Sequence, residues 1–301
     1  MKLTILGCFS ATPKTNAHTT SQVLEVKGDL FLIDCGEGTQ IQLRKIGIKF
    51  NRIKHVFISH LHGDHLYGLI GLISTFRLLG RTSDLNIYGP KGIKEIITIQ
   101  LKYAKGWTDY NLFFHELSSL ESEFIYENDK LKISTIPLNH RIYTNGFLFK
   151  EKIGLRKINL KSVEFNSIDF SFYENLKLGK HYINHNGDII LNRNLTFDPN
   201  SPKSYAFCSD TCYNESIVPL ISDVDLLYHE STFLEIHKEL AVKTKHSTAI
   251  DAAKIANLAN VNKLLLGHFS TRYTDLTKFI KESKNYFDNT ELAHDGKIIE
   301  F

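Results

Sequence analysis

Three histidines and an aspartate lie within six consecutive positions, from His60 to His65. They come directly after the apolar run Val56–Ile58, which is typical of a buried strand. Imidazole and carboxylate groups are preferred ligands of zinc and related transition metals, and a loop at the end of a strand can direct several of them to one point. His60 and His62 point the same way if the backbone stays extended. The cluster therefore indicates a metal site, and a solvated histidine-rich loop is the alternative.

The same stretch indicates a second metal position. Asp64 and His65 follow where the chain turns at Gly63, so their side chains reach a point beside the first. Further ligand candidates follow other predicted strands, and together they complete a set, although a single histidine after a strand is usually structural. The proposed first group is His60, His62 and His140, the second is Asp64, His65 and His268, and Asp210 can bridge the two with its two oxygens.

Paired metals favour one class of reaction. Two ions about 3.5–4 Å apart stabilise both the attacking and the leaving oxygen of an in-line displacement. The ligand set therefore predicts phosphodiester chemistry.

Short apolar strands alternate with helical patterns along the chain, which predicts an α/β layered fold able to position these ligands. The predicted strands are Leu3–Leu6, Val23–Val26, Phe31–Ile33, Val56–Ile58, Leu85–Tyr88, Ile133–Ile136, Tyr205–Phe207, Leu226–Tyr228 and Lys263–Leu266. The predicted helices are Leu69–Leu79, Ile93–Tyr103, Thr248–Leu258 and Leu276–Tyr286. The stretch from Lys150 to Pro202 differs, because it is polar, rich in Lys and Asn and weakly periodic, and it is interpreted as an insertion or arm.

Composition limits the function classes. The chain has 301 residues, of which 42% are hydrophobic, so it can bury a sizeable core. Its formal net charge of +3 is too small for a generally basic nucleic-acid binder, so any polyanion must meet a local patch. The apolar run Leu3–Leu6 breaks at Gly7 and reads as a first strand, not as a signal peptide. The four cysteines match neither a disulfide framework nor a paired zinc motif, which favours reduced thiols and a cytoplasmic location.

Motifs along the whole chain resemble one family. The ligand cluster alone resembles the metallo-β-lactamase superfamily, and the finer motifs are similar to those of ribonuclease Z, the endonuclease family that processes the 3′ end of tRNA. The stretches His246–Thr248 and His268–Tyr273 are the most specific. The other matching stretches are Ile33–Gln40, Ser59–His65, Gly68–Leu72, Tyr88–Pro90, Ser209–Thr211 and His229–Phe233.

The resemblance implies a fold and an activity. The expected fold is a single α/β domain over residues 1–301, a four-layer αβ/βα metallo-β-lactamase sandwich with a shortened inserted arm-like region over residues 150–202. The expected protein is a cytoplasmic homodimer with two Zn²⁺ ions per chain and no membrane association. It would remove the 3′ trailer from precursor tRNA, leaving a 3′ hydroxyl on the tRNA and a 5′ phosphate on the trailer.

The resemblance also implies roles for residues near the ligands. His246 would stabilise charge and protonate the departing 3′ oxygen, and Glu230 would orient it, unless Glu230 is an exposed carboxylate at a strand end. Asp64 would accept a proton as well as bind metal, although a metal-bound carboxylate is a poor free base. Arg272 would bind phosphate oxygens, with a surface salt bridge as its alternative.

The chain departs from the family pattern in two places. Ala17 and His18 stand where members that discriminate against a CCA end often have an Arg-Asn pair, so the treatment of CCA-bearing tRNA stays open. The arm-like region lacks the usual Gly-Pro motif. The cations Lys150, Lys152, Arg156, Lys157 and Lys161 could supply a phosphate-binding patch there, or could be ordinary surface charges.

Three other functions are alternatives. A broader zinc phosphodiesterase or 3′ exoribonuclease is the main alternative, which the missing Gly-Pro motif favours. A thioesterase of the glyoxalase II type would not require the motifs around His246 and His268. A catalytically inactive RNA-binding protein would be expected to have lost ligands, and the sequence shows no such loss.

Overall fold

The computed structural model describes residues 1–12 and 14–301, and Pro13 lies outside the described residues. The chain forms two compact units. Unit 1 comprises Met1–Glu127, Lys132–Lys150 and Lys203–Phe301, and unit 2 comprises Asn128–Leu131 and Glu151–Pro202. Unit 2 thus covers almost the same residues as the predicted inserted region 150–202, whose use as an arm stays a prediction.

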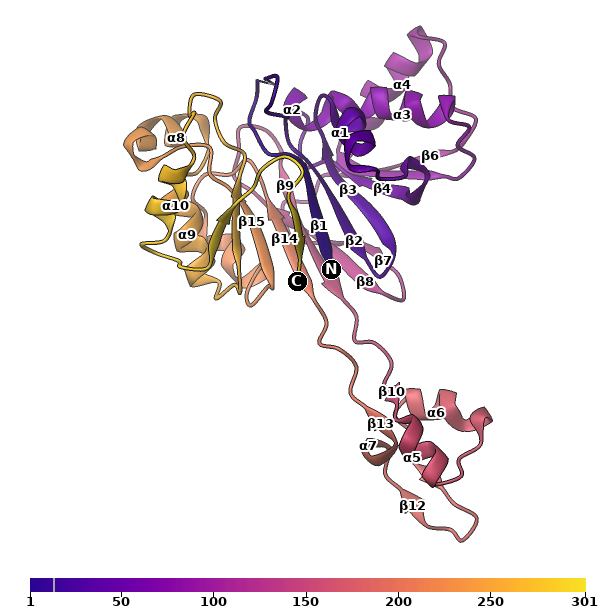
Figure 1. Ribbon diagram of the computed structural model, residues 1–301. Helices are drawn as coiled ribbons and strands as arrows, with labels where there is room; N and C mark the ends of the chain where they lie inside the picture. The colour runs from indigo at the N-terminus through magenta and orange to yellow at the C-terminus, as the bar shows by residue number, and fades with distance from the viewer. Residues whose placement is uncertain (13) are drawn as a thin grey trace. The chain divides into compact units, whose positions relative to one another are not determined.

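Unit 1 contains two seven-stranded sheets (Figure 1). The first has the order β18 (Ile298–Glu300), β1 (Lys2–Gly7), β2 (Ser21–Val26), β3 (Asp29–Cys35), β4 (Ile53–Phe57), β5 (Leu85–Pro90) and β6 (Leu112–Leu117). The second has the order β17 (Thr290–Leu292), β16 (Leu264–Gly267), β15 (Leu226–Glu230), β14 (Ser204–Cys208), β9 (Asn145–Glu151), β8 (Leu131–Pro137) and β7 (Phe124–Glu127).

The sheets face each other through aromatic side chains. Phe31 and Phe57 of the first sheet lie with their ring centroids 5.8 Å and 5.4 Å from Phe149 and Phe147, respectively, of the second. All four rings are fully buried. This interface explains why apolar residues occur on both faces of the central strands, since helices cover the opposite faces.

Helices form the two outer layers of unit 1 (Figure 1). Beside the first sheet lie α1 (Thr39–Ile46), α2 (Gly63–Leu66), α3 (Gly68–Leu78) and α4 (Ile93–Tyr103), and beside the second lie α8 (Lys238–Thr244), α9 (Ala249–Leu258) and α10 (Thr277–Ser283). Short 3₁₀ turns cover Phe50–Arg52, Glu215–Leu220 and Glu235–His237. The helix–sheet–sheet–helix order confirms the predicted four-layer α/β sandwich.

Every predicted strand and helix is present, with ends shifted by a few residues at most. The prediction was incomplete, because within unit 1 it missed the helices α1, α2 and α8 and the strands β6, β7, β9, β17 and β18. Four of these five strands, all except β9, lie at the edges of the two sheets. Edge strands are partly exposed and so lack a continuous apolar run.

Unit 2 has a small core of its own. Val163, Ile168, Leu176 and Leu195 are buried together. Around them lie α5 (Leu160–Phe165), α6 (Tyr173–Lys177), α7 (Asn192–Leu195) and the 3₁₀ turn Phe170–Phe172, with the two-residue strand pairs β10 (Lys157–Ile158) with β13 (Thr196–Phe197) and β11 (Tyr182–Ile183) with β12 (Ile189–Ile190). The weak periodicity of this region therefore conceals regular but very short elements.

Two further sequence expectations concern membranes and thiols. Within the part of the chain that the structure describes, no helix combines the length and apolar character needed to cross a membrane. The four cysteines are all free thiols, and Cys8, Cys35 and Cys208 are buried.

Candidate metal centre and catalytic site

The candidate ligands meet at one end of the two sheets because each follows the carboxyl end of a strand, one in the first sheet and three in the second. His60 and His62 follow β4, His140 follows β8, Asp210 follows β14, and His268 follows β16. The backbones of Asp210 and His268 adopt positive φ angles of 62° and 58°. Such left-handed residues are uncommon away from glycine and concentrate at functional sites, where they turn the chain sharply and aim a side chain.

The first predicted group is assembled in the structure. His62 Nδ1 lies 2.9 Å from His60 Nε2 and 3.3 Å from His140 Nε2. One carboxylate oxygen of Asp210, Oδ2, lies 3.5 Å from His60 Nε2 and 3.6 Å from His140 Nε2. Four potential ligand atoms thus surround one point.

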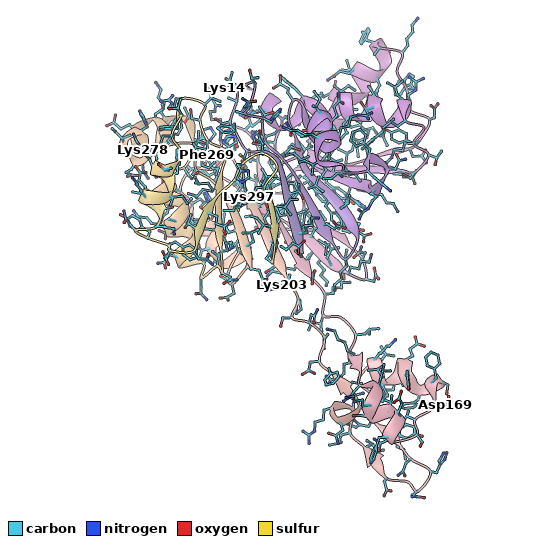
Figure 2. The ribbon with its side chains drawn as sticks, viewed as in Figure 1. Lys14, Asp169, Lys203, Phe269, Lys278 and Lys297 are labelled. Atoms are coloured by element: carbon cyan, nitrogen blue, oxygen red, sulfur yellow. The ribbon has the colours of Figure 1, made fainter. Side chains whose placement is uncertain are left out.

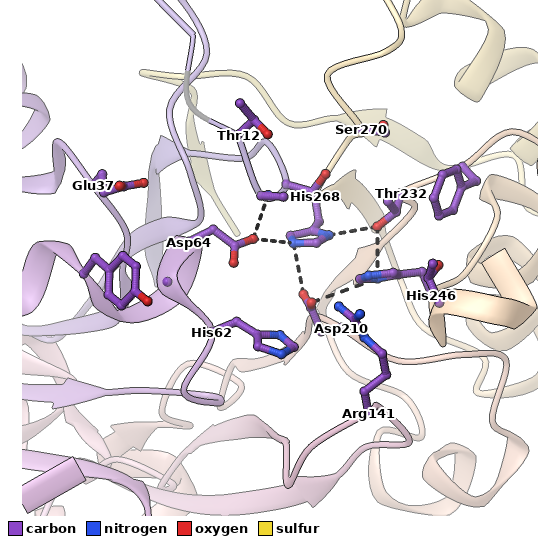
Figure 3. A pocket seen from close by; sticks show the side chains of 16 residues that line it. Thr12, Glu37, His62, Asp64, Arg141, Asp210, Thr232, His246, His268 and Ser270 are labelled. Carbon is purple, nitrogen blue, oxygen red and sulfur yellow. Dashed lines mark hydrogen bonds and ion pairs between the residues drawn. The ribbon is translucent and has the colours of Figure 1, made fainter. Parts of the chain in front are cut away.

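The second predicted group lies on the other side of Asp210 (Figure 3). His65 Nε2 and His268 Nε2 are 3.3 Å apart, and Asp64 Oδ2 is 3.4 Å and 3.5 Å from them. The second oxygen of Asp210, Oδ1, lies 3.2 Å from His65 and 3.0 Å from His268. Asp210 therefore faces both groups with one oxygen each.

These spacings fit metal ions better than they fit hydrogen bonds. Zinc bonds of about 2.0–2.1 Å in a tetrahedron place neighbouring ligand atoms ~3.3 Å apart. The ligand atoms of His60, His62, His140 and Asp210 all lie within 4.8 Å of one another, and so do those of Asp64, His65 and His268. Asp210 Oδ1 adds a fourth atom beside His65 and His268. His60, His65 and His268 are almost completely buried. Without a metal ion, their clustered ring nitrogens would be buried at a cost in free energy that no ligand offsets.

Hydrogen bonds hold the rings of His65 and His140 so that Nε2, the potential ligand atom of each, is free to bind a metal. His65 Nδ1 lies 2.6 Å from Asp34 Oδ2, and His140 Nδ1 lies 2.9 Å from the carbonyl oxygen of Lys245. Both partners accept hydrogen bonds, so each Nδ1 carries the proton and each Nε2 keeps a lone pair. Such partners of a metal-binding histidine fix its tautomer and raise its basicity. Asp34 was part of a quoted motif, but sequence analysis gave it no role.

His246 lies beside the second group and is held by Glu230. His246 Nδ1 donates to Glu230 Oε1 over 2.7 Å. The other ring nitrogen is then available to the catalytic pocket, the cavity that His246 lines together with the candidate ligands His62, Asp64, Asp210 and His268. Although burial opposes it, the Glu230 carboxylate raises the pKa of His246 to about 9. His246 could instead form a third ligand group with Asp210 and His268. The short bond from Nδ1 to Glu230 favours the proton-carrying role.

Glu230 is fully buried, so it is not the exposed carboxylate that the sequence left open. It accepts hydrogen bonds from the backbone N–H groups of Thr211 and Thr232, at 2.9 Å and 3.0 Å, and from the Thr232 hydroxyl at 2.6 Å. Since that hydroxyl donates to Glu230, it accepts from His268 Nδ1, 2.8 Å away. Thr232 thus links Glu230, the partner of His246, to the candidate ligand His268. No spacing in the sequence indicated this link.

Asp64 is held by the loop after β1. Its Oδ2 accepts a hydrogen bond of 2.7 Å from the backbone N–H of Ala11. Burial would raise the pKa of Asp64, but the adjacent His65 holds it well below the usual range. A carboxylate so strongly stabilised as an anion is a weak proton acceptor, which favours the ligand role.

Two arginines lie near the pocket, and only one was predicted. Arg272 is exposed, and its guanidinium lies 5.1 Å from the ring of Phe233 and 3.2 Å, through Nε, from Ser270 Oγ. Among the described residues it has no ion-pair partner, which argues against the surface salt bridge. Arg141 lines the pocket itself, near His62 and His246 (Figure 3). Its position directly after the ligand His140 was the available sequence signal.

The residue at the CCA-related position is firmly held. His18 Nδ1 lies 2.6 Å from Asp295 Oδ2, and the His18 backbone N–H donates to the same oxygen over 3.1 Å. The pair joins the loop after β1 to the segment near the carboxyl terminus. His18 thus anchors that loop in place of offering a free side chain.

Comparisons with known proteins agree with the geometry. The family model described as "Anti-Pycsar protein Apyc1" matches residues 1–157, which include the ligand candidates up to His140. Ribonuclease Z of Bacteroides fragilis is 46% identical over 99% of this chain and 98% of its own length, and that of Bacteroides thetaiotaomicron is 44% identical over 99% and 94%. The crystal structure of the short form of human tRNase Z covers 100% of this chain and 99% of its own, at 27% identity and a TM-score of 0.74.

Proposed function

This chain belongs to the ribonuclease Z family, and we propose that it removes the 3′ trailer from precursor tRNA with two zinc ions bound in the two ligand groups. The observation that carries the proposal is the two clusters of ligand atoms on either side of Asp210, with the His246–Glu230 pair beside them. The first zinc would be held by His60, His62, His140 and Asp210, and the second by Asp64, His65, His268 and Asp210.

The metals supply Lewis acidity toward the phosphate and lower the pKa of water. His246 provides the proton for the departing 3′ oxygen from the ring nitrogen that faces the pocket. Glu230 holds the opposite nitrogen and keeps the imidazole in its cationic form until transfer, which preserves the correct orientation. Water supplies the oxygen that replaces the 3′ oxygen on phosphorus, and the proton that this water loses balances the one that His246 gives up. The tRNA is released with a 3′ hydroxyl, and the phosphate stays on the trailer.

The arginines would bind the substrate's phosphates. Arg141 lines the pocket beside His62 and His246, so its guanidinium can contact the scissile phosphate or the next one. Arg272, stacked on Phe233, lies at the rim and fits a phosphate farther along the strand. A planar guanidinium pairs with two phosphate oxygens at once, and this geometry favours arginine over lysine for such contacts. For Asp64 the proposed role is metal binding, with proton acceptance secondary.

Unit 2 would bind tRNA away from the scissile bond. The cations predicted to form its patch are not equally available, because Arg156 is paired with Asp198 and donates to Thr196, and Lys157 donates to Asn200. Phosphate would therefore replace existing partners at these two positions. The family resemblance further supports a cytoplasmic homodimer, and light scattering coupled to size exclusion would measure the assembly.

The proposal is tested with end-labelled precursor tRNA, with and without a chelator, and with elemental analysis of the active protein. One cut at the start of the trailer, abolished by the chelator, and about two zinc ions per chain are expected. A single metal in a fully active preparation would refute the dinuclear arrangement. Stepwise loss of nucleotides from the 3′ end would favour a 3′ exoribonuclease, and hydrolysis of only a small phosphodiester would favour a broader phosphodiesterase.

A further inference from the structure

A second, apolar pocket adjoins the metal centre. It has a volume of about 470 Å³ and lies at the carboxyl ends of β5 and β6, between the loop that carries His60 and His62 and the loop that carries His140. The apolar pocket, as it is called below, is lined by Leu61, Pro90, Lys91, Leu117, Ser118, Ile142 and Tyr143.

The apolar pocket lies beside the catalytic pocket, because residues adjacent in the chain line one pocket each. Leu61 lines the apolar pocket while its chain neighbour His62 lines the catalytic one. In the same way Ile142 lines the apolar pocket while its neighbour Arg141 lines the catalytic one. The segments 61–62 and 141–142 thus separate the two pockets. An RNA strand that crosses this boundary would pass next to the candidate ligands His62 and His140.

The walls of the apolar pocket are rigid. The Tyr143 hydroxyl donates to the carbonyl oxygen of Ser119 over 2.9 Å and accepts from Asn145 Nδ2 over 2.8 Å, which fixes the ring. Pro90 and Leu117 are paired across β5 and β6. A binding surface already held in place loses little conformational entropy when a ligand arrives.

Two cations stand beside this apolar surface. Lys91 is exposed and belongs to the wall, and Arg141 is exposed at the boundary with the catalytic pocket. Among the residues that the structure describes, neither side chain has an ion-pair or hydrogen-bond partner. An apolar slot next to positive groups matches a nucleotide, whose base has an apolar face and whose phosphates are anionic.

We propose that the apolar pocket binds one unpaired nucleobase of the RNA next to the scissile phosphate, with Arg141 and Lys91 contacting the adjoining phosphates. The base packs against the ring of Tyr143 and the side chains of Leu61 and Ile142. This inference rests on the proposed ribonuclease function. It makes the enzyme sensitive to the presence of a base at one position near the cut, without selecting which base, because every base offers a stacking face.

The test combines substrate and protein changes. A set of precursor tRNAs carries a single abasic nucleotide at each of the two positions on either side of the cut, and KM and kcat are measured for each. The protein variants are Ile142→Asp, in the wall of the apolar pocket, and Leu120→Asp as the matched control. Both residues are exposed apolar side chains, at 39% and 82%, but Leu120 does not line the pocket. Metal content and thermal unfolding show that each variant is folded.

The expected result is a coupling between one base and Ile142. In the wild type and in Leu120→Asp, one abasic position raises KM by ~10-fold, the usual contribution of a stacked base. Ile142→Asp raises KM on the intact precursor by a similar factor and removes the effect of that abasic position.

The failures are distinguishable. If the wild type does not cut the intact precursor, the proposed function falls. If it cuts but no abasic position changes KM, the function stands and the inference is overturned. Additive losses from Ile142→Asp and the abasic nucleotide, or the same loss of base dependence in Leu120→Asp, would also overturn it, because the base would then be bound elsewhere.

Discussion

At the scale of single residues, the site depends on groups that hold other groups. Glu230 and Asp34 are fully buried carboxylates, and neither lies in a ligand group. Each accepts a short hydrogen bond from a histidine ring and further hydrogen bonds from hydroxyl or backbone groups. These hydrogen bonds offset the free-energy cost of burying a charged carboxylate. The geometry of the candidate metal centre therefore depends on side chains that lie outside both ligand groups.

The variant His246→Ala should lower kcat on precursor tRNA by ~10²- to 10⁴-fold, the usual contribution of a general acid, and should keep its zinc. Single-turnover cleavage and elemental analysis measure the two effects. His294→Ala is the matched control, because His294 is exposed and its ring has no hydrogen-bond partner among the described residues besides the Asp295 carbonyl. Unchanged cleavage would remove His246 from the mechanism, and loss of zinc would make it a ligand.

The variant Asp34→Asn should weaken zinc binding by ~10- to 100-fold, as outer-shell substitutions usually do. An amide at this position presents N–H groups toward His65 Nδ1, which favours the tautomer whose Nε2 is protonated. Competition with a chelating dye measures the zinc affinity. Asp225→Asn serves as control, since Asp225 accepts from Ser204 and Lys203 and lies in no ligand group. Equal zinc affinity in both variants would show that Asp34 does not set the His65 tautomer.

At the scale of elements, close approach of backbones positions the loop that carries the ligands. A Cβ atom on Gly68, the first residue of α3, would lie 2.1 Å from the carbonyl oxygen of Gly36. A Cβ on Gly36 would lie 2.4 Å from the carbonyl oxygen of Asp64. The segment after β3 and the start of α3 can therefore touch only without side chains, and the ligand Asp64 lies at that contact.

The variant Gly68→Ala should lower the free energy of unfolding by ~1–3 kcal/mol through overpacking, although alanine has the better helix propensity. Urea denaturation measures it. Gly106→Ala is the control, because a Cβ there would meet nothing closer than 3.8 Å. Equal stability of the two variants would mean that α3 shifts without cost, and the close contact would then be unimportant for the site.

At the scale of the whole molecule, chemistry and substrate capture are proposed to reside in different units. Both ligand groups and the His246–Glu230 pair lie in unit 1, and unit 2 has its own small core. The longer segment of unit 2, Glu151–Pro202, leaves unit 1 after Lys150 and returns to it at Lys203. The next residue, Ser204, is paired with Lys150 across β9 and β14. This pairing allows the longer segment of unit 2 to be replaced by a short connection, while Asn128–Leu131 stays in the chain.

Replacing Glu151–Lys203 with Asn-Gly, a preferred two-residue hairpin turn, should leave unit 1 folded. We expect tRNA affinity to fall by at least ~10-fold and its salt dependence to flatten, because fewer phosphate contacts release fewer counterions. Hydrolysis of a small phosphodiester should persist, and that substrate provides the internal control. Equal losses on both substrates would show that unit 2 supports the fold, and no loss on either would remove it from tRNA binding.

The sequence by itself determined the fold class and which residues gather at the metal centre. Ligand types are recognisable because histidine and aspartate in a short loop after a buried strand have few other uses, and parallel strand ends meet at one edge of a sheet. The candidates His65 and His268, 203 positions apart, do lie together. Central strands were predictable because burial on both faces requires continuous apolar runs, whereas the partly exposed edge strands β6, β7, β17 and β18 left no such pattern.

Only the tertiary structure decided the contacts that depend on distance between segments. Glu230 could be read as exposed or as a partner of His246, and only the packing of the loops after β15 and β16 buries it against Thr232. The apolar pocket combines residues from four separate segments, none of which is unusual alone. The physical reason is that spacing along the chain sets direction within one element, whereas neighbours between elements are set by the packing of whole layers.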